Sequence, residues 1–249
     1  GTLDLAFRLH KMGIPIIGVP KTIDNGLVGT DYTVGLQTAV EVACDALDRL
    51  HSTGRSHQRV MILEVMGRNA GWIALEAGIA GGAHIILIPE LPYRIENVLK
   101  KIGFRARGGS PYSIIMVAEG AAEEGGEPIV ANSAGTRLQG VPQLGGVGFH
   151  VANRIRQHID LEVRCTVLSY IQRGGSPCAF DRVLGTRLGA YAVEAAARGE
   201  FGSMVALRTP EIVLVPLAEV AGRFRNIPER SQLIRTAEAI GINLGGEAM

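Results

Sequence analysis

Short apolar runs rich in β-branched residues alternate with helix-like segments along the whole chain, and this alternation limits the fold more than any other feature. The runs have the length of buried strands and are bounded by glycine, proline or polar turns. Predicted strands cover residues 14–19, 60–65, 84–88, 113–118, 162–169, 205–207 and 212–215. Predicted helices lie near 2–9, 34–50, 72–81, 95–104, 145–158, 182–198 and 231–240, with polar loops at 52–58 and 121–128. Such alternation predicts an α/β fold with mostly parallel sheets.

The loop after the first predicted strand runs from Pro20 to Gly26. In open α/β sheets, ligands bind at the carboxyl ends of strands, where backbone amides are not used by the ladder. Lys21 supplies a cation, Thr22 a hydroxyl and Asp24 a carboxylate in this one turn. Alone, Asp24 is more typical of an Asx-type turn that satisfies local amides. The loops further along the chain favour a ligand site instead.

Three more charged residues stand in loops that directly follow predicted strands: Arg68, Glu119 and Arg173. Arg59 and Arg164 flank two of these strands. A single arginine such as Arg68 is most often a surface residue. However, the carboxyl ends of parallel strands meet at one edge. We therefore expect Arg68, Glu119 and Arg173 to converge with Asp24 in one crevice.

A crevice with several arginines and two carboxylates fits a phosphorylated substrate that carries hydroxyl groups. The planar fork of arginine matches phosphate oxygens, and charge-assisted contacts are stronger than neutral ones. Glu119 would accept a bond from a sugar hydroxyl, and Asp24 would take the proton of an attacking hydroxyl. Arg68 would neutralise charge on the transferring phosphoryl group, and for this it must face the same pocket as Asp24.

Composition excludes several other classes of protein. The 249 residues carry a net charge of +1, which favours neither nucleic acid nor a membrane surface. No apolar run has membrane-spanning length. The three cysteines have no paired or metal-ligand spacing, which favours reduced thiols and a cytoplasmic location. The 33 glycines gather in short turns, as in α/β enzymes that handle phosphate.

Six motifs, in order along nearly the whole chain, resemble those of the 6-phosphofructokinases. They are Pro20-Lys21-Thr22-Ile23-Asp24-Asn25, Gly29-Thr30-Asp31-Tyr32-Thr33, Ser56-His57-Gln58-Arg59, Glu64-Val65-Met66-Gly67-Arg68, Ile79-Ala80-Gly81-Gly82 and Gln172-Arg173-Gly174-Gly175-Ser176-Pro177. This family transfers a phosphoryl group from ATP, or in one branch from pyrophosphate, to the 1-hydroxyl of fructose 6-phosphate. The resemblance also implies Mg²⁺ and two similar three-layer α/β/α domains, the first of them incomplete here.

The resemblance assigns a role to each matching residue. Asp24 and Arg68 would be catalytic, and Gly1, Thr2 and Lys21 would lie on the donor side. Arg59 and Arg164 would reach the 6-phosphate from a neighbouring subunit of a homotetramer. The residues implied for binding the sugar phosphate are Thr22, Ile23, Asp24, Arg59, Met66, Gly67, Arg68, Glu119, Arg164, Tyr170, Ile171, Gln172 and Arg173.

The resemblance also divides the chain into domains. Residues 1–35 and 172–222 would form the donor-side domain, and residues 36–171 and 223–249 the fructose 6-phosphate side. Gly1 and Thr2 match the tail of a Gly-Gly-Asp-Gly-Thr motif, so we expect a fragment that lacks the magnesium-binding Asp and most of the nucleotide loop. We therefore expect little or no kinase activity from this polypeptide alone.

Three positions depart from the family pattern. Gly26 stands where the family usually has an Asp that serves magnesium binding or active-site charge, and Tyr170 stands where many members have His. His84 replaces an acidic residue of the bacterial effector site. Gly1 favours ATP as the donor, whereas Lys21 occurs in pyrophosphate users and in a mixed branch. ATP is the preferred donor; a pyrophosphate-dependent transferase and a non-catalytic sugar-phosphate-binding homologue are the alternatives.

Overall fold

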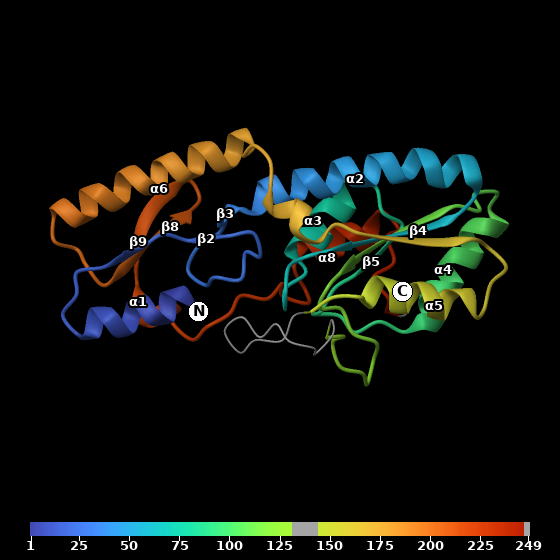
Figure 1. The fold of residues 1–249 in the computed structure, drawn as a ribbon, viewed down its shortest axis with the longest axis horizontal. Coiled ribbons are helices and arrows are strands. Elements are labelled where there is room, and N and C mark those ends of the chain that lie inside the picture. The colour runs from blue at the N-terminus through green and yellow to red at the C-terminus, as the bar shows by residue number, and fades with distance from the viewer. Residues whose placement is uncertain (131–143, 247–249) are drawn as a thin grey trace. The chain divides into compact units, whose positions relative to one another are not determined.

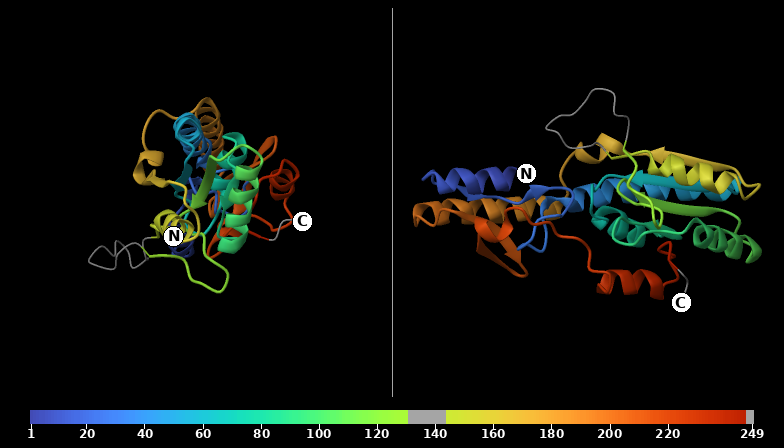
Figure 2. Two further views of the ribbon diagram at one scale, coloured as in Figure 1. Left: turned by 90° about the vertical axis from the view of Figure 1, so that its right-hand side faces the viewer. Right: turned by 90° about the horizontal axis from the view of Figure 1, so that it is seen from below.

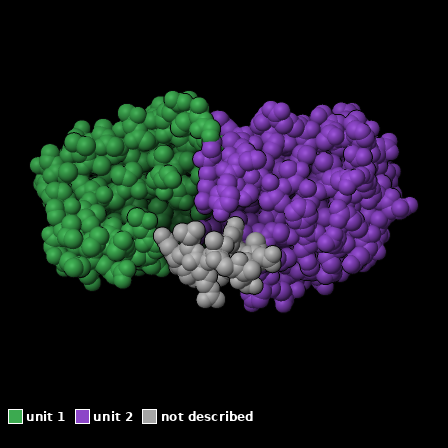
Figure 3. All heavy atoms as spheres, in the orientation of Figure 1, with its two compact units in different colours: residues 1–38, 175–225 green, residues 39–174, 226–249 purple. Residues whose placement is uncertain are grey.

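The computed structural model describes residues 1–130 and 144–246, and the chain forms two compact units (Figure 3). Unit 1 comprises residues 1–38 and 175–225, and unit 2 comprises residues 39–174 and 226–249. The predicted domain ends at 35, 171 and 222 each lie three residues before the ends of the corresponding segments at 38, 174 and 225. The donor and sugar roles of these domains stay predictions.

Unit 1 is built on strand β8 (Ser203–Arg208), which pairs parallel with β1 (Ile17–Gly18) and antiparallel with β9 (Glu211–Pro216). Successive side chains of β8 point to opposite faces. Met204 and Ala206 pack towards helices α1 (Thr2–Lys11) and α7 (Leu217–Val220), and Val205 and Leu207 pack against α6 (Ala179–Ala197). This unit thus has helices on both faces of its sheet, as predicted.

A second, two-stranded parallel sheet in unit 1 joins β2 (Lys21–Thr22) to β3 (Val34–Gly35). The long helix α2 (Leu36–His57) begins directly after β3 (Figure 1). Asp181 caps its first turn: its carboxylate accepts the amides of Gly35 and Thr38, both at 2.8 Å.

Unit 2 contains a fully parallel sheet in the order β5-β6-β4-β7. Its strands are β4 (Val60–Val65), β5 (Ile85–Leu87), β6 (Ser113–Ala118) and β7 (Val163–Val167). Val60 and Ile62 face a core built with α4 (Ile95–Arg107) and α5 (Val147–Arg156). On the other face, Gly54 of α2 lies against Met61, and Gly78 of α3 (Trp72–Ala80) lies against Ile86.

Helix α8 (Gln232–Ala239) packs on α3, on the far side from the sheet (Figure 2). Because α4 and α5 cover one face of the sheet and α2 and α3 cover the other, unit 2 is a three-layer α/β/α structure. This confirms the predicted fold class. Among the described residues, no helix is both long and apolar enough to cross a membrane.

Three elements differ from the predicted ones. The loop predicted at 52–58 is helical as far as His57, because the hydroxyls of Ser52 and Ser56 bond carbonyls three residues earlier within α2 instead of breaking it. The strand predicted at 14–19 is reduced to Ile17–Gly18, the only two positions with partners on β8. The strand predicted at 162–169 ends at Val167, and residues Ser169–Arg173 form a 3₁₀ helix, η2.

Candidate functional site

Three of the predicted site segments follow adjacent parallel strands of unit 2. Strand β4 lies between β6 and β7, so the segments that begin at Met66, Glu119 and Ser169 leave the sheet side by side at its carboxyl edge. The turn after β4 runs from Met66 to Gly71, where α3 begins. Within it Gly67 has φ 146° and Arg68 has φ 52°. The left-handed conformation is rare for a residue with a side chain, so contacts must hold Arg68 there.

Side chains from the two neighbouring strand ends supply those contacts. The Oε1 atom of Gln172, in η2, accepts the amide of Met66 at 2.7 Å. The Oε1 atom of Glu119 accepts the amides of Gly67 at 3.2 Å and Arg68 at 2.8 Å. Both side chains are buried, with exposures of 1% for Gln172 and 8% for Glu119. The backbone of the turn is therefore fixed before any ligand arrives.

Gly120 lets the two loops approach closely. A Cβ atom at this position would lie 2.1 Å from the carbonyl oxygen of Arg68, which is far inside van der Waals contact. Only glycine allows the backbone of Arg68 to lie against the end of β6. Glu119 therefore bonds the Arg68 turn, and the adjacent Gly120 leaves room for it.

Helix η2 brings the last predicted sugar-site motif to the same edge. Tyr170 and Ile171 are exposed, and the guanidinium of Arg173 lies 5.5 Å from the centre of the Tyr170 ring. The Nε2 atom of Gln172 is buried and has no hydrogen-bond partner among the described residues. The edge therefore offers the Arg173 cation and the fixed Arg68 turn.

Asp24 lies in unit 1, in the loop after β2. Its carboxylate accepts the hydroxyl of Thr22 at 3.3 Å, and its own amide donates to that hydroxyl, also at 3.3 Å. Lys21 is exposed, and Ile23 is partly buried. Because Asp24 and Arg68 belong to different units, a pocket shared by the two stays a prediction.

Asn25 links the motif at residues 20–25 to the motif at residues 29–33. It is buried, with φ 51°, and its side-chain oxygen accepts the amide of Thr33 at 3.0 Å. The Thr33 hydroxyl in turn donates to the carbonyl of Thr22 at 2.6 Å. The two motifs thus form one hydrogen-bonded loop that presents Asp24.

Gly26, the departure from the family pattern, is packed against an aromatic ring. A Cβ atom there would lie 2.3 Å from Cε2 of Phe224, and the amide of Arg225 donates to the Gly26 carbonyl at 3.0 Å. The space that a side chain would need is therefore filled by Phe224. No group of three or more His, Cys, Asp or Glu side chains that could hold a metal ion occurs in residues 1–130 and 144–246.

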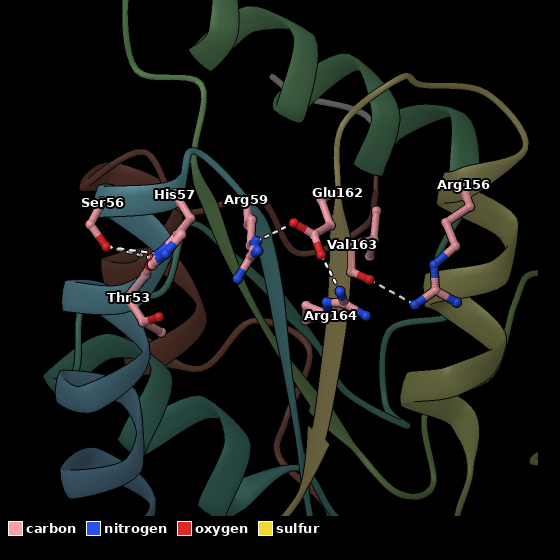
Figure 4. Close-up of polar contacts among 8 residues, drawn as sticks. All are labelled: Thr53, Ser56, His57, Arg59, Arg156, Glu162, Val163 and Arg164. Atoms are coloured by element: carbon pink, nitrogen blue, oxygen red, sulfur yellow. Dashed lines mark hydrogen bonds and ion pairs between the residues drawn. The ribbon is translucent and has the colours of Figure 1, made fainter.

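Arg59 and Arg164, which we expect to flank two strands and to act on a neighbouring subunit, lie away from the carboxyl edge. Arg59 precedes the first residue of β4 and Arg164 is the second residue of β7, so both lie at the amino end of the sheet. Six strand residues at about 3.3 Å each put roughly 20 Å between Arg59 and the Arg68 turn. Both arginines bond Glu162, which lies between them (Figure 4).

Glu162 and its two arginines are at least partly exposed. Desolvation acts to raise the pKa of Glu162, but the bond from Arg59 and the charge of Arg164 outweigh it and hold the pKa below its ordinary value. Nearby, the Arg156 guanidinium donates to the Val163 carbonyl at 2.7 Å. At the amino edge, Arg59 and Arg164 therefore bond the carboxylate of Glu162, and Arg156 bonds the neighbouring residue Val163.

His84, the replacement at the predicted effector position, is part of a cluster of rings. Its Nδ1 accepts the amide of Ile114 at 2.9 Å, and its ring meets those of His51 and Tyr112 edge-on. Burial, together with the charge of Arg105, lowers the pKa of His84 to about 3. The ring is therefore neutral at physiological pH and supports the fold.

Sequence reasoning missed two glutamates that shape the sheet ends. Glu64, the fifth of the six residues of β4 and 2% exposed, accepts the amides of Gly146 at 2.9 Å and Gly148 at 2.7 Å at the start of α5. Glu90, after β5, accepts the amides of Gly71 and Ile227. The sequence carried a signal for each residue. Glu64 is a charged residue inside the apolar run 60–65, and Glu90 follows a predicted strand.

The donor-side residues Gly1 and Thr2 are exposed at the start of α1. The Gly1 carbonyl accepts the amide of Asp4 at 3.1 Å. Nothing in unit 1 tests a nucleotide role for Gly1, Thr2 or Lys21, which stays a prediction.

Comparison with known proteins agrees with the motifs. The family model described as Phosphofructokinase matches residues 1–196. The ATP-dependent 6-phosphofructokinase of Chloroflexus aurantiacus is 53% identical over 247 residues, which are 99% of this chain and 67% of that protein. The pyrophosphate--fructose 6-phosphate 1-phosphotransferase of Amycolatopsis methanolica is 50% identical over 91% of this chain and 66% of that protein.

A solved structure gives the same result. The pyrophosphate-dependent phosphofructokinase of Marinobacter aquaeolei superposes with a TM-score of 0.78 at 28% sequence identity, over 97% of this chain and 62% of that one. The chain thus spans about two thirds of the length of the relatives it matches. The matched family model, the identities and the fold agree, and the chain belongs to the phosphofructokinase family.

Proposed function

We propose that this chain serves the transfer of the terminal phosphoryl group of ATP to the 1-hydroxyl of fructose 6-phosphate. The product would be fructose 1,6-bisphosphate, a step of glycolysis. The observation that carries the proposal is the preorganised carboxyl edge of unit 2, where Glu119 and Gln172 fix the Arg68 turn beside the Arg173 cation. Relatives named as ATP-dependent 6-phosphofructokinases, 45–53% identical to the chain, support it.

Each residue has a distinct proposed task. Asp24 takes the proton of the attacking 1-hydroxyl, and its bond with Thr22 orients the carboxylate. Arg68 neutralises charge that develops on the transferring phosphoryl group. Arg173 binds the 6-phosphate as a charge-assisted partner, aided by Tyr170 and Ile171. The remaining sugar contacts are assigned to Ile23, Met66, Gly67, Glu119 and Gln172.

Two alternatives follow from specific observations. Pyrophosphate as donor is supported by Lys21 and by the Amycolatopsis methanolica relative, although Gly1 and the ATP-dependent relatives favour ATP. A non-catalytic sugar-phosphate-binding homologue is supported by Gly26, where Phe224 fills the space of the family's Asp. Gly1, Thr2 and Lys21 stay the proposed donor-side residues.

The family also implies Mg²⁺, which would supply positive charge to neutralise the phosphate groups of the donor. The described residues do not form a metal site by themselves, since no cluster of three candidate ligands is found among them. We therefore derive no catalytic step through the ion. A cytoplasmic location, consistent with three free cysteines, also stays a proposal.

We further propose a homotetramer in which Arg59 and Arg164 bind the 6-phosphate held by a neighbouring subunit. Their place at the amino edge, away from the Arg68 turn of their own chain, supports a contribution in trans. Sedimentation of the native chain and of variants in which Arg59 or Arg164 is replaced by Ala, each with and without fructose 6-phosphate, would test this. An assembly that forms only when both arginines are present would support the proposal, and a monomer at all concentrations would oppose it.

The function is tested by calorimetric binding of fructose 6-phosphate, followed by assays with ATP and with pyrophosphate. We expect saturable binding of the sugar phosphate that is lost in Arg173→Ala. Product from ATP alone would support the kinase, and product from pyrophosphate would support the second branch. Binding with no product from either donor would agree with the little or no activity expected of this polypeptide alone, and no binding would contradict the proposal.

A further inference from the structure

Glu90 stands at the carboxyl end of β5, at the same edge of the sheet as the Arg68 turn. Its Oε1 atom accepts the amide of Gly71 at 3.1 Å and that of Ile227 at 3.0 Å, and its Oε2 atom accepts the Gly71 amide at 3.1 Å. The carboxylate is partly buried. Each bond is charge-assisted and therefore stronger than a neutral one.

Gly71 is both the last residue of the turn and the N-cap of α3. A Cβ atom there would lie 2.4 Å from Cγ2 of Ile88 and 3.0 Å from Oε2 of Glu90, so the backbone rests directly on the Glu90 segment. A carboxylate at a helix start is also favoured by the partial positive charge of the free amides. The turn is thus held at its start by Gln172 and Glu119 and at its end by Glu90.

Ile227 gives Glu90 a second attachment. The chain passes from unit 1 to unit 2 between Arg225 and Asn226, and Ile227, only 2% exposed, is the second residue after this crossing. One carboxylate therefore bonds the Arg68 turn and the first buried residue of the returning chain.

We propose that Glu90 is a positioning residue that sets the Arg68 turn for the sugar phosphate and couples it to the segment that re-enters unit 2 at Asn226. This inference rests on the proposed function, because it names what keeps the proposed sugar site in shape. Glu90 acts through the backbone of the turn. Its carboxylate is already occupied by two amides.

The experiment compares Glu90→Ala, Glu90→Gln and the control Glu96→Gln, whose side chain is exposed at the start of α4. Amide hydrogen exchange by NMR reports on the turn without reference to function. We expect at least tenfold faster exchange at Gly71 and Ile227 in Glu90→Ala. Glu90→Gln keeps one acceptor oxygen and is expected to recover part of the protection, while Glu96→Gln leaves both amides unchanged.

Calorimetric binding of fructose 6-phosphate supplies the second readout. Affinity is expected to fall about tenfold in Glu90→Ala and less in Glu90→Gln. Burial raises the pKa of Glu90, although the amides of Ile227 and Gly71 oppose this shift. Acidification should therefore weaken binding more in the native chain and Glu96→Gln than in Glu90→Gln, where this group does not titrate.

The outcomes separate the two hypotheses. A native chain that binds no fructose 6-phosphate contradicts the proposed function, while hydrogen exchange still decides whether Glu90 holds the turn. Native affinity in a folded Glu90→Ala chain, or a lower melting temperature with unchanged affinity, would overturn the positioning role. Unchanged exchange at Gly71 would overturn it as well.

Discussion

The two ends of the unit 2 sheet both collect charged side chains, but they hold them in different ways. At the carboxyl edge, Glu119 and Gln172 are buried and bond the backbone of the Arg68 turn. At the amino edge, Arg59 and Arg164 share Glu162 through side-chain contacts at the surface. The first edge is fixed by bonds to backbone amides, and the second by ion pairs between partly exposed side chains.

This difference indicates what each edge is suited to do. A preorganised turn loses little entropy when it binds a small ligand, so it can position reacting groups accurately. Exposed ion pairs contribute little to stability and exchange partners easily. The amino edge is therefore suited to a partner from outside the chain, in agreement with the proposed contribution of Arg59 and Arg164 to a neighbouring subunit.

The largest effect is expected from Gly120→Ala. The new Cβ atom would meet the Arg68 carbonyl oxygen at 2.1 Å, so one of the two backbones must move. We expect about a 100-fold loss of affinity for fructose 6-phosphate, as for a misplaced binding group, and destabilisation of about 1–3 kcal/mol. Calorimetry and urea unfolding would measure the two effects.

Gly103→Ala provides the matched control. Gly103 lies within α4, where a Cβ atom would only touch the end of the flexible Arg107 side chain at 3.4 Å. This variant should be slightly more stable and should bind normally, because alanine favours the helix. Normal binding by Gly120→Ala would show that the turn is not fixed as the structure indicates.

The next effect tests the buried carboxylate beneath α5. In Glu64→Gln, one of the amides of Gly146 and Gly148 would face an NH₂ group in place of an acceptor oxygen. We expect a loss of about 1–3 kcal/mol in the free energy of unfolding, the cost of an unsatisfied buried donor. Urea unfolding beside the exposed control Glu127→Gln would measure it, and equal stability of the two variants would contradict the capping role.

His84→Asn should have a smaller, pH-dependent effect. The pKa of His84 is lowered to about 3, so between about pH 6.5 and pH 3 the unfolded chain binds a proton that the folded chain does not. The contribution of the neutral ring to stability is therefore present at pH 7 and lost on acidification. Asn can accept the Ile114 amide but does not titrate.

Urea unfolding at pH 7 and pH 5 would measure this effect. The native chain should lose stability on acidification by on the order of 1 kcal/mol more than His84→Asn, after allowance for solvent screening of a partly exposed group. Parallel losses in the two proteins would show that His84 is not the group that titrates.

The smallest effect is expected at the amino edge. Glu162→Gln removes the carboxylate shared by Arg59 and Arg164, and exposed ion pairs of this kind add little to stability. The melting temperature should stay unchanged, while the affinity of the chain for inorganic phosphate should rise slightly because the arginines lose their competitor. A clear drop in melting temperature would mean that this edge is as firmly built as the other.

The strands of unit 2 were the most predictable part of the fold. The predicted strands at 60–65 and 113–118 match β4 and β6 residue for residue, because both are uninterrupted buried runs in a parallel sheet. The end of α2 was not predictable from composition, since Ser52, Gly54 and Ser56 favour a loop. Packing of Gly54 on Met61 overrides that preference.

The placement of three candidate site residues was predictable, and their hydrogen-bond partners were less so. Arg68, Glu119 and Arg173 were found because each follows a strand, and parallel pairing brings them to one edge. Strand direction already places Arg59, just before β4, at the opposite edge. The bonds of Glu90 with Gly71 and Ile227 join residues 19 and 137 positions apart, which no local pattern reveals.

The central claim is that the carboxyl edge of the unit 2 sheet binds fructose 6-phosphate on a turn that is already in place. Amide chemical-shift mapping by NMR, with fructose 6-phosphate titrated into the chain, tests it most directly. We predict that the amides of Gly67, Arg68 and Arg173 shift saturably, while those of Arg59 and Arg164 do not shift in the monomeric chain. Saturable shifts confined to the amino edge, or no saturable shifts at all, would contradict the claim.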